Sequence, residues 1–210
     1  MRRPAQSGFS LVELAVTLTV MVLLVTAAFP SVADWLRSTR VRNAAASIQS
    51  GLMRARAEAL RTNQLVTFWM VRGSAETAVD ASCALSSASG SWVVSLNDPS
   101  GACATAPSPA SAPMITETHA AGDGGTGVTV AAVNAAGDAA QCVRFNGFGR
   151  VVDSSTGPAD TCRQPLQIAK IDVTHAAGGA RALRVVVSAG GSVRTCDANV
   201  TATTDPRKCP

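Results

Sequence analysis

The residues with the clearest chemistry in this sequence are six cysteines, and every one of them follows residue 82. They are Cys83, Cys103, Cys142, Cys162, Cys196 and Cys209. Their spacing lacks the paired Cys-x-x-Cys units of a zinc site, so we expect no metal. An even number of cysteines in an exported domain is typical of disulfides, with buried free thiols as the alternative. Among the fifteen pairings that six cysteines allow, we favour Cys83–Cys103, Cys142–Cys162 and Cys196–Cys209, because each closes a short loop.

A second chemical feature is a lone carboxylate, Glu13, at the head of an apolar run. From Leu14 to Phe29 the only polar residues are three threonines, whose hydroxyls can bond back to their own helix. The run is about 20 residues long, which is the length that a helix needs to cross the hydrocarbon core of a membrane. An ionised carboxylate in that setting is costly unless it is paired. We therefore expect Glu13 to have a function.

The remaining residues do not form a catalytic constellation. His119 and His175 are the only histidines, and they are not spaced as a pair of metal ligands. The segment Gly122 to Gly127, GDGGTG, has the spacing of a dinucleotide loop, but a proline-rich stretch precedes it and a β-type run follows it. We expect no cofactor and no enzymatic activity.

One long helix must carry Glu13. Nothing interrupts a helix from Phe9 to about Arg61 except Pro30, where we expect a kink. Beyond the proline, apolar residues recur at spacings of four and three, and arginines occupy the other faces. These apolar residues are Val41, Ala45, Ile48, Leu52, Ala55 and Ala59. The second half of the helix is therefore predicted to be amphipathic.

After Asn63 the pattern changes to short β-branched runs separated by turn residues. The runs are QLVTFWMV, SWVVSL, TGVTVAAV, QCVRFN, LQIAKIDVT and ALRVVVS. This spacing suggests antiparallel strands, and the amphipathic helix laid across one face gives an α+β class. The segment from Cys103 to Gly127 is rich in alanine, proline and glycine and is predicted to be a flexible loop.

Charge is distributed unevenly within a net charge of +4. Residues 9–62 carry six arginines and three acids, a balance of +3. Residues 63–141 carry one arginine and six acids, a balance of −5, and residues 142–210 carry nine basic residues and five acids, a balance of +4. This asymmetry favours an anionic partner at one end.

The N-terminus allows two interpretations. In the first, Arg2, Arg3 and the apolar run form a secretory signal that is cleaved before Asp34. In the second, a charged leader ends at Gly8 and the apolar helix stays with the mature protein. Only the second gives a reason for Glu13, and only the second keeps the apolar helix joined to the amphipathic one that continues it in phase.

The segment GFSLVEL, Gly8 to Leu14, resembles the prepilin peptidase site of type IV pilins and of the pseudopilins of type II secretion. The resemblance implies cleavage between Gly8 and Phe9 and methylation of the new amino-terminal Phe9. Glu13 matches the acidic position of the family, which is paired with the amino terminus of a neighbouring subunit in the filament. Pro30 matches a proline kink that is seen in many pilins.

Three further segments are similar to the FimT, FimU and GspH branch of minor pilins. They are ARAEALRTNQLVTF, FNGFGR at Phe145 to Arg150, and LRVVVSAGGSVR at Leu183 to Arg194. The resemblance implies a type IV pilin fold, in which a long N-terminal helix packs on an antiparallel β-sheet domain. We expect a leader peptide at 1–8, a transmembrane and filament-core helix at 9–30, an amphipathic helix at 31–62, and a disulfide-bonded β-rich domain at 63–210 with the flexible loop at about 103–127.

By this resemblance the chain is a minor pilin that takes part in assembly or initiation of a type IV pilus, near the filament tip. The alternative is a GspH-like minor pseudopilin of type II secretion. The implied partners are other minor pilins, the major pilin, prepilin peptidase and inner-membrane lipid. The implied location is the inner membrane, with a single span and the β domain in the periplasm, followed by an extracellular pilus or a periplasmic pseudopilus.

A second alternative is DNA binding in natural transformation, because some FimT-like proteins bind DNA through a carboxy-terminal GRxR motif. The corresponding stretch here is Gly191-Ser192-Val193-Arg194, so only the last arginine of that motif is present. Phosphate binding needs no single motif, however, and a cluster of basic residues can supply it. The candidates are Arg181, Arg184, Arg194, Arg207 and Lys208.

Overall fold

The computed structural model describes residues 10–75, 78–124, 127–152, 162 and 167–210, with the backbone alone at residues 27–30, 123 and 124. One long helix, α1 (Leu11–Thr62), begins the chain and nine short strands follow it within the described residues. The chain divides into two compact units, Met1–Leu36 and Arg37–Pro210, and α1 contributes to both. This composition confirms the α+β class.

The first unit is helical from Leu11 onward, and its side chains find little to pack against within the chain. Leu11 is 84% exposed and Leu24 is 67% exposed. The hydroxyls of Thr17 and Thr26 donate to the backbone carbonyls of Leu14 and Leu23, both at 2.9 Å. Because these hydroxyls are satisfied within the helix, the segment presents an almost wholly apolar surface. By length and composition α1 qualifies as a membrane-spanning helix.

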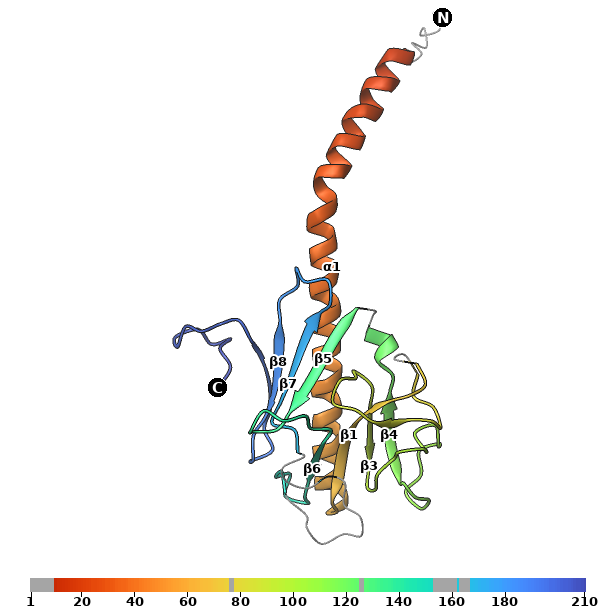
Figure 1. Ribbon diagram of the computed structural model, residues 1–210, viewed down its shortest axis with the longest axis vertical. Helices are drawn as coiled ribbons and strands as arrows, with labels where there is room; N and C mark the ends of the chain where they lie inside the picture. Colours follow the sequence, from red (N-terminus) through yellow and green to blue (C-terminus); the bar gives the residue numbers. More distant parts are fainter. Residues whose placement is uncertain (1–9, 76–77, 125–126, 153–161, 163–166) are drawn as a thin grey trace, which may run out of the picture. The chain divides into compact units, whose positions relative to one another are not determined.

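The second unit contains two antiparallel sheets that lie side by side against the rest of α1 (Figure 1). The first sheet has the order β2-β1-β3-β4, and β6 also pairs with β1. Its strands are β1 (Val66–Arg72), β2 (Ala84–Leu85), β3 (Trp92–Ser95), β4 (Ile115–His119) and β6 (Cys142–Phe145). The second sheet has the order β5-β7-β8-β9. Its strands are β5 (Val128–Val133), β7 (Lys170–His175), β8 (Leu183–Val187) and β9 (Val193–Asp197).

The main core lies between α1 and the two sheets. Every member of the predicted apolar face of the helix is at most 1% exposed; these are Val41, Ala45, Ile48, Leu52, Ala55 and Ala59. They pack with inward side chains of both sheets. Gly51 lets the first sheet approach closely, since a Cβ there would come within 2.8 Å of the rings of Phe68 and Trp92. The amphipathic pattern therefore does determine how the second half of the helix packs.

A second, smaller core covers the other face of the first sheet. Successive residues of a strand point to opposite faces, so Phe68 and Met70 join the main core while Trp69 and Val71 face away from it. Trp69 packs there with two disulfides, Cys83–Cys103 and Cys142–Cys162. The disulfides thus complete a layer for which the sheet alone has too few apolar residues.

The prediction of one loop from Cys103 to Gly127 is wrong. This segment contains the strand β4 and a short 3-10 helix, η1 (Ala121–Gly124). β4 pairs with β3 along one side, and Ile115 is the one apolar and fully buried residue among its five, so the strand lacks an apolar run. The alanine, proline and glycine content belongs to the turns on either side of that strand.

Candidate functional site

Glu13 lies in the first turn of α1, where a carboxylate is favoured by the partial positive charge of the helix N-terminus. Its helical neighbours Val12 and Leu14 are 69% and 56% exposed, so the carboxylate stands on an open apolar surface. Gly8 and Phe9 lie outside the described residues, and their processing stays a prediction. The same holds for the kink at Pro30, through which the helical backbone continues.

In the globular unit, α1 has a second apolar face opposite the buried one. This face is formed by residues at spacings of seven, four and three, namely Ala46, Met53, Ala57 and Leu60. Each lies two positions before a repeating position of the buried face. At 3.6 residues per turn, that offset places them on the other side of the helix. Met53 is 49% exposed and Leu60 is 50% exposed. The helix therefore offers a solvent-facing apolar stripe rather than a wholly polar surface.

Two of the sequence motifs meet at Arg56 of α1. The Nε of Arg56 donates to the backbone carbonyl of Gly149, in the FNGFGR segment, at 3.0 Å. Gly191, in the LRVVVSAGGSVR segment, lies directly against the same carbonyl. Sequence reasoning singled out both segments but not their meeting point, because that contact joins positions 93 residues apart.

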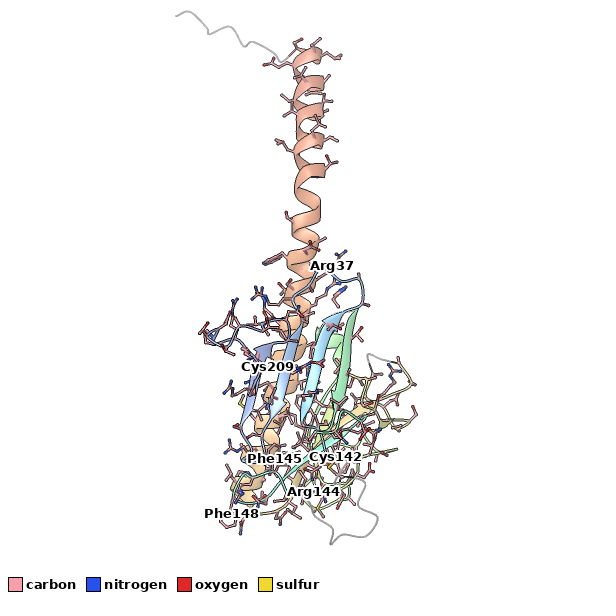
Figure 2. The ribbon with its side chains drawn as sticks, turned by 60° about the vertical axis from the view of Figure 1, so that its left-hand side comes forward. Arg37, Cys142, Arg144, Phe145, Phe148 and Cys209 are labelled. Atoms are coloured by element: carbon pink, nitrogen blue, oxygen red, sulfur yellow. A yellow bond between two sulfur atoms is a disulfide. The ribbon has the colours of Figure 1, made fainter. Side chains whose placement is uncertain are left out.

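The FNGFGR segment forms a tight turn after β6. The Asn146 side-chain oxygen accepts the backbone N–H groups of Phe148 at 3.0 Å and Arg150 at 3.1 Å. The Gly149 N–H donates to the Asn146 carbonyl at 2.8 Å, and Gly149 has a φ of 70°, which glycine adopts without strain. The turn holds Phe148 outward, 81% exposed (Figure 2).

The six cysteines form the sequential disulfides favoured above. The pairs are Cys83–Cys103, Cys142–Cys162 and Cys196–Cys209. Cys142 and Cys162 are fully buried, whereas Cys209 is only partly buried. These bonds stabilise loops, and no free thiol remains among the described residues.

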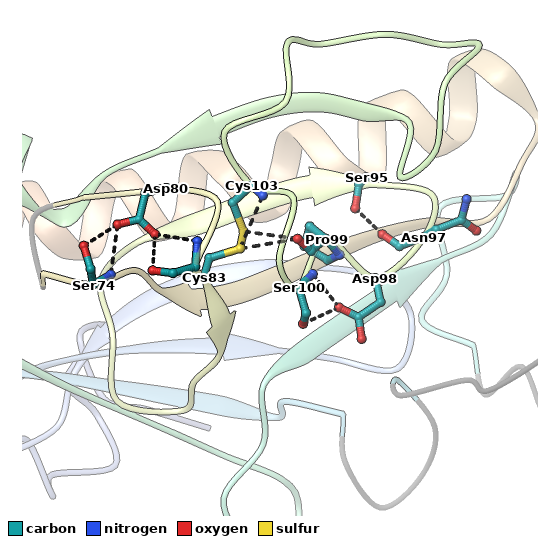
Figure 3. Close-up of a disulfide and its surroundings, with 10 residues drawn as sticks. Ser74, Asp80, Cys83, Ser95, Asn97, Asp98, Pro99, Ser100 and Cys103 are labelled. Atoms are coloured by element: carbon teal, nitrogen blue, oxygen red, sulfur yellow. Dashed lines mark hydrogen bonds between the residues drawn. A yellow bond between two sulfur atoms is a disulfide. The ribbon is translucent and has the colours of Figure 1, made fainter.

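The loop before Cys83 is organised by Asp80 (Figure 3). Its carboxylate accepts the backbone N–H groups of Ser74 at 3.0 Å and Ser82 at 2.9 Å, together with both hydroxyls. The hydroxyls of Ser74 and Ser82, followed by these amides, hold the pKa of Asp80 well below its usual range. The role of Asp80 is therefore structural.

Three of the five basic candidates are paired with aspartates. Arg184 donates to both oxygens of Asp172, at 2.6 and 3.0 Å, a hydrogen-bonding arrangement that raises the pKa of the arginine. The other two pairs are Arg181–Asp197 at 3.3 Å and Arg207–Asp205 at 2.7 Å. The Arg207 side chain lowers the pKa of Asp205 to about 2. Much of the basic end is thus neutralised internally.

Arg194 and Lys208 form no ion pair within the described part of the chain. Sequence reasoning missed a third cation of this surface, Lys170. Lys170 pairs with Val186 across β7 and β8, and Val186 pairs with Arg194 across β8 and β9. Directly opposed residues share a face of a sheet, so Lys170 and Arg194 lie on the same face.

The two histidines have structural surroundings in different sheets. The ring of His119 in β4 stacks on Trp92 with centroids 5.3 Å apart. His175 ends β7, and its Nδ1 accepts the backbone N–H of Ala177 at 3.2 Å. The described residues contain no cluster of three or more His, Cys, Asp or Glu side chains suited to a metal.

Comparison with known proteins places these features in a family. The family model described as "Type II transport protein GspH" matches residues 44–191, and the model described as "Prokaryotic N-terminal methylation motif" matches residues 3–29. No curated protein sequence matches the chain.

Two crystal structures of the type IV minor pilin FimU from Pseudomonas aeruginosa are similar in fold. One is 14% identical, with a TM-score of 0.45 over 73% of this chain and 90% of that one. The other is 13% identical, with a TM-score of 0.44 over 73% of this chain and 86% of that one. The GspH model includes Arg56, Gly149 and Gly191 and covers well over half of the sequence. The chain therefore belongs to the GspH family of pilin-like subunits, whose members are structural proteins of type IV pili and type II secretion.

Proposed function

We propose that the chain is a minor pilin of a type IV pilus, placed at or near the filament tip. Before assembly the apolar part of α1 anchors it in the inner membrane, with the β-rich unit in the periplasm. Family membership supports a role in pilus assembly or type II secretion, and of these two roles we propose pilus assembly.

The observation that carries the proposal is the apolar stripe on the outward side of α1. In the globular unit its members are Ala46, Met53, Ala57 and Leu60, all of which are exposed. In the first unit the alternation of four and three residues places large apolar side chains in the same sequence phase. These are Leu11, Leu18, Val22, Val25, Val32 and Leu36, each at least 45% exposed. Apolar residues at this spacing form the seams by which helices pack against other helices.

Glu13 supplies specificity in this arrangement. A carboxylate at the head of an apolar seam is costly to bury alone, because its desolvation penalty is offset only by a well-placed cation. The processed amino terminus of a neighbouring subunit is a suitable cation, and it would be created by prepilin peptidase cutting between Gly8 and Phe9. Glu13 then acts as an assembly residue and not as a catalyst.

The nearest alternative is a minor pseudopilin of a type II secretion system, which the description of the matching family favours. Both systems use the same leader and helix, so they differ in the partners of the subunit. Identifying the partners of the subunit therefore distinguishes the two systems.

The test is to extract the full chain from its own membranes with its partners, and to identify them and the amino terminus by mass spectrometry. We expect a methylated Phe9 and co-purifying pilus minor pilins. Secretion pseudopilins with the same terminus would assign the chain to type II secretion instead. An amino terminus at Asp34 would overturn both assignments.

The role of Glu13 is tested with Glu13→Gln, which keeps the shape of the side chain but removes its charge. We expect the variant to keep its three disulfides and to lose its co-purifying pilins. Asp34→Asn is the control, since it removes an acid from the same helix beyond the apolar run. Equal loss of partners in both variants would contradict the role of Glu13.

A further inference from the structure

The outer edge of β9 is only partly covered by the chain itself. β9 is the last strand of the second sheet, so it pairs with β8 on one side only. Even-numbered positions bond toward β8, as the hydrogen bond from the Ala198 N–H to the Ala182 carbonyl at 3.2 Å shows. Because backbone groups alternate in direction along an antiparallel strand, those of Val193, Thr195 and Asp197 point away from β8.

The C-terminal segment, dark blue in Figure 1, covers one end of this edge. The Asp197 N–H donates to the Arg207 carbonyl at 2.8 Å, and Asp197 forms a parallel bridge with Lys208. The Cys196–Cys209 disulfide ties the segment to β9. At Asp197 the edge therefore already pairs with another segment of backbone.

The rest of this edge is open. Within the described residues, no main-chain or side-chain group bonds to the outward N–H and C=O of Val193 or Thr195. Thr195 is exposed and Val193 is partly exposed. An extended peptide beside them can bond to both residues and so add a strand to the sheet.

Arginines lie on both sides of the open edge. The Thr195 hydroxyl donates to the Gln49 side-chain oxygen of α1 at 2.6 Å, so Arg194, the preceding residue, faces the opposite side of the sheet. Arg194 is exposed. On the helix side, Arg42 and Arg56 lie seven residues before and after Gln49 and share its face of α1. The edge is therefore positively charged around Thr195.

Acidic side chains do little to offset this charge. Residues 181–210 carry five basic residues and two aspartates, a balance of +3. Both aspartates already pair with arginines, Asp197 with Arg181 and Asp205 with Arg207. Arg42 and Arg194 form no ion pair in the described ranges. A ligand that carries carboxylates is thus the electrostatic complement of this edge.

We propose that the open edge of β9 binds an extended acidic segment of another protein, which adds a strand beside Val193 and Thr195. A glutamate or aspartate directly opposite Arg194 would share its face of the sheet and attract it. A second copy of β9 is disfavoured here because it brings another Arg194, and like charges on neighbouring strands repel. The inference goes beyond the proposed function and applies equally in a pilus and in a pseudopilus.

Backbone chemistry favours a peptide over nucleic acid at this position. The open edge offers C=O acceptors as well as N–H donors. A DNA phosphate backbone can accept from the N–H groups, but it has no donor for the carbonyls, whereas a peptide strand pairs with both. Duplex DNA at this surface would therefore bind through the cations alone.

The test uses the full chain in a neutral detergent and a synthetic peptide, TEVETEV, with a dye at its amino terminus. Every second residue of the peptide is glutamate, so its extended conformation has one acidic face. Binding is measured by fluorescence anisotropy, and the protected amides are mapped by hydrogen exchange with NMR detection. We expect exchange at the Val193 and Thr195 amides to slow, and exchange at Ala136, in the exposed turn after β5, to remain unchanged.

Val193→Pro removes one outward N–H from the edge. The variant should fold, because that N–H has no partner in the described chain and proline is tolerated at the first residue of an edge strand. We expect it to bind TEVETEV about tenfold more weakly. Val128→Pro is the matched control, since Val128 begins β5 at the opposite edge of the same sheet and its N–H points away from β7. This control should bind the peptide as the wild type does.

Arg194→Gln tests the preference for an acidic ligand. The variant should bind TEVETEV about two- to fivefold more weakly than the wild type does. Its binding of TQVQTQV, a peptide of the same shape without charge, should be unchanged. Equal binding of the two peptides to the wild type would overturn the acidic preference.

Absence of binding at millimolar peptide would overturn the inference, as would binding that leaves exchange at Val193 and Thr195 unchanged. Equal binding of TEVETEV to the wild type and to folded Val193→Pro would also overturn it, and would mean that the cations attract any polyanion, duplex DNA included. If Val193→Pro does not fold, hydrogen exchange in the wild type still decides the question.

These outcomes are independent of the tests of the proposed function. If the chain recruits pilus minor pilins but does not bind the peptide, the inference fails and the proposed function stands. If the chain binds the peptide but recruits secretion pseudopilins, the reverse holds.

Discussion

The guanidinium of Arg56 donates to the backbone carbonyl of Gly149, and Gly191 packs against that same oxygen so tightly that a Cβ at position 191 would lie 1.8 Å from it. One side chain of α1 thus holds the turn after β6, and the turn between β8 and β9 packs on that turn. The junction joins both sheets to the helix, because β6 belongs to the first sheet and β8 to the second.

Replacing Arg56 with leucine should destabilise the globular unit. The substitution keeps apolar bulk but leaves the part-buried Gly149 carbonyl without its donor, which costs about 1–3 kcal/mol. Urea unfolding of the full chain in detergent, followed by tryptophan fluorescence, measures the loss. Arg54→Leu is the matched control, because the Arg54–Glu117 pair is exposed and such pairs contribute about 1 kcal/mol or less. Similar losses in the two variants would contradict the role of Arg56.

Gly191→Ala should be far more destabilising than Gly178→Ala. Both glycines lie in turns of the second sheet with positive φ, 80° at Gly191 and 66° at Gly178, so alanine pays a similar backbone penalty of about 1–2 kcal/mol at each. Only Gly191 adds a steric clash, since nothing lies within 4 Å of a Cβ at Gly178. We expect a further loss of about 1–3 kcal/mol at Gly191, measured by the same unfolding experiment. Equal effects would show that the turn moves freely away from Gly149.

Much of the fold follows from local patterns in the sequence. The spacing of apolar residues from Val41 to Ala59 predicts the buried face of α1. The six β-branched runs cover β3, β5, β6 and β8, and all but the last residue of β1 and β7. The strands that the sequence does not reveal are β2, β4 and β9, and all three lie at sheet edges. An edge strand pairs on one side and is less buried, so its pattern is weaker.

The candidate site is less predictable, because it depends on contacts between distant residues. The meeting of two glycine turns at Arg56 and the pairing of Arg184 with Asp172 both follow from strand register and packing. Composition shows a basic last third but not which of its cations are neutralised. Because Lys170 and Arg194 are 24 positions apart in the sequence, their position on the same face of the second sheet becomes evident only from the strand register.

Mild reduction should open the disulfides in a defined order. A thiolate must reach a sulfur to attack it, and Cys209 is the least buried of the six cysteines. We expect Cys196 and Cys209 to be alkylated first under native conditions, with the pairs around Trp69 protected. Mass spectrometry of the alkylated peptides over time gives the order. Reaction of Cys142 and Cys162 at the same rate would contradict the role of the second core in shielding them.

Binding of duplex DNA should be weak and only mildly dependent on salt. Each phosphate contact contributes about −0.9 to the slope of log Kobs against log salt concentration. Three cations of the basic surface have no ion pair within the described residues, namely Lys170, Arg194 and Lys208, so the slope should not be steeper than about −3.

Two variants test which cations contribute to that slope. Arg194→Gln should make it shallower by about one, because it removes a free cation. Arg184→Gln should leave it unchanged, because the Arg184 guanidinium is held by both oxygens of Asp172 and releases no counterion from DNA. A slope that flattens with Arg184→Gln and not with Arg194→Gln would mean that the ion pair opens for DNA. The surface around β8 would then act as a nucleic-acid receptor, and the DNA phosphates would displace Asp172 from Arg184.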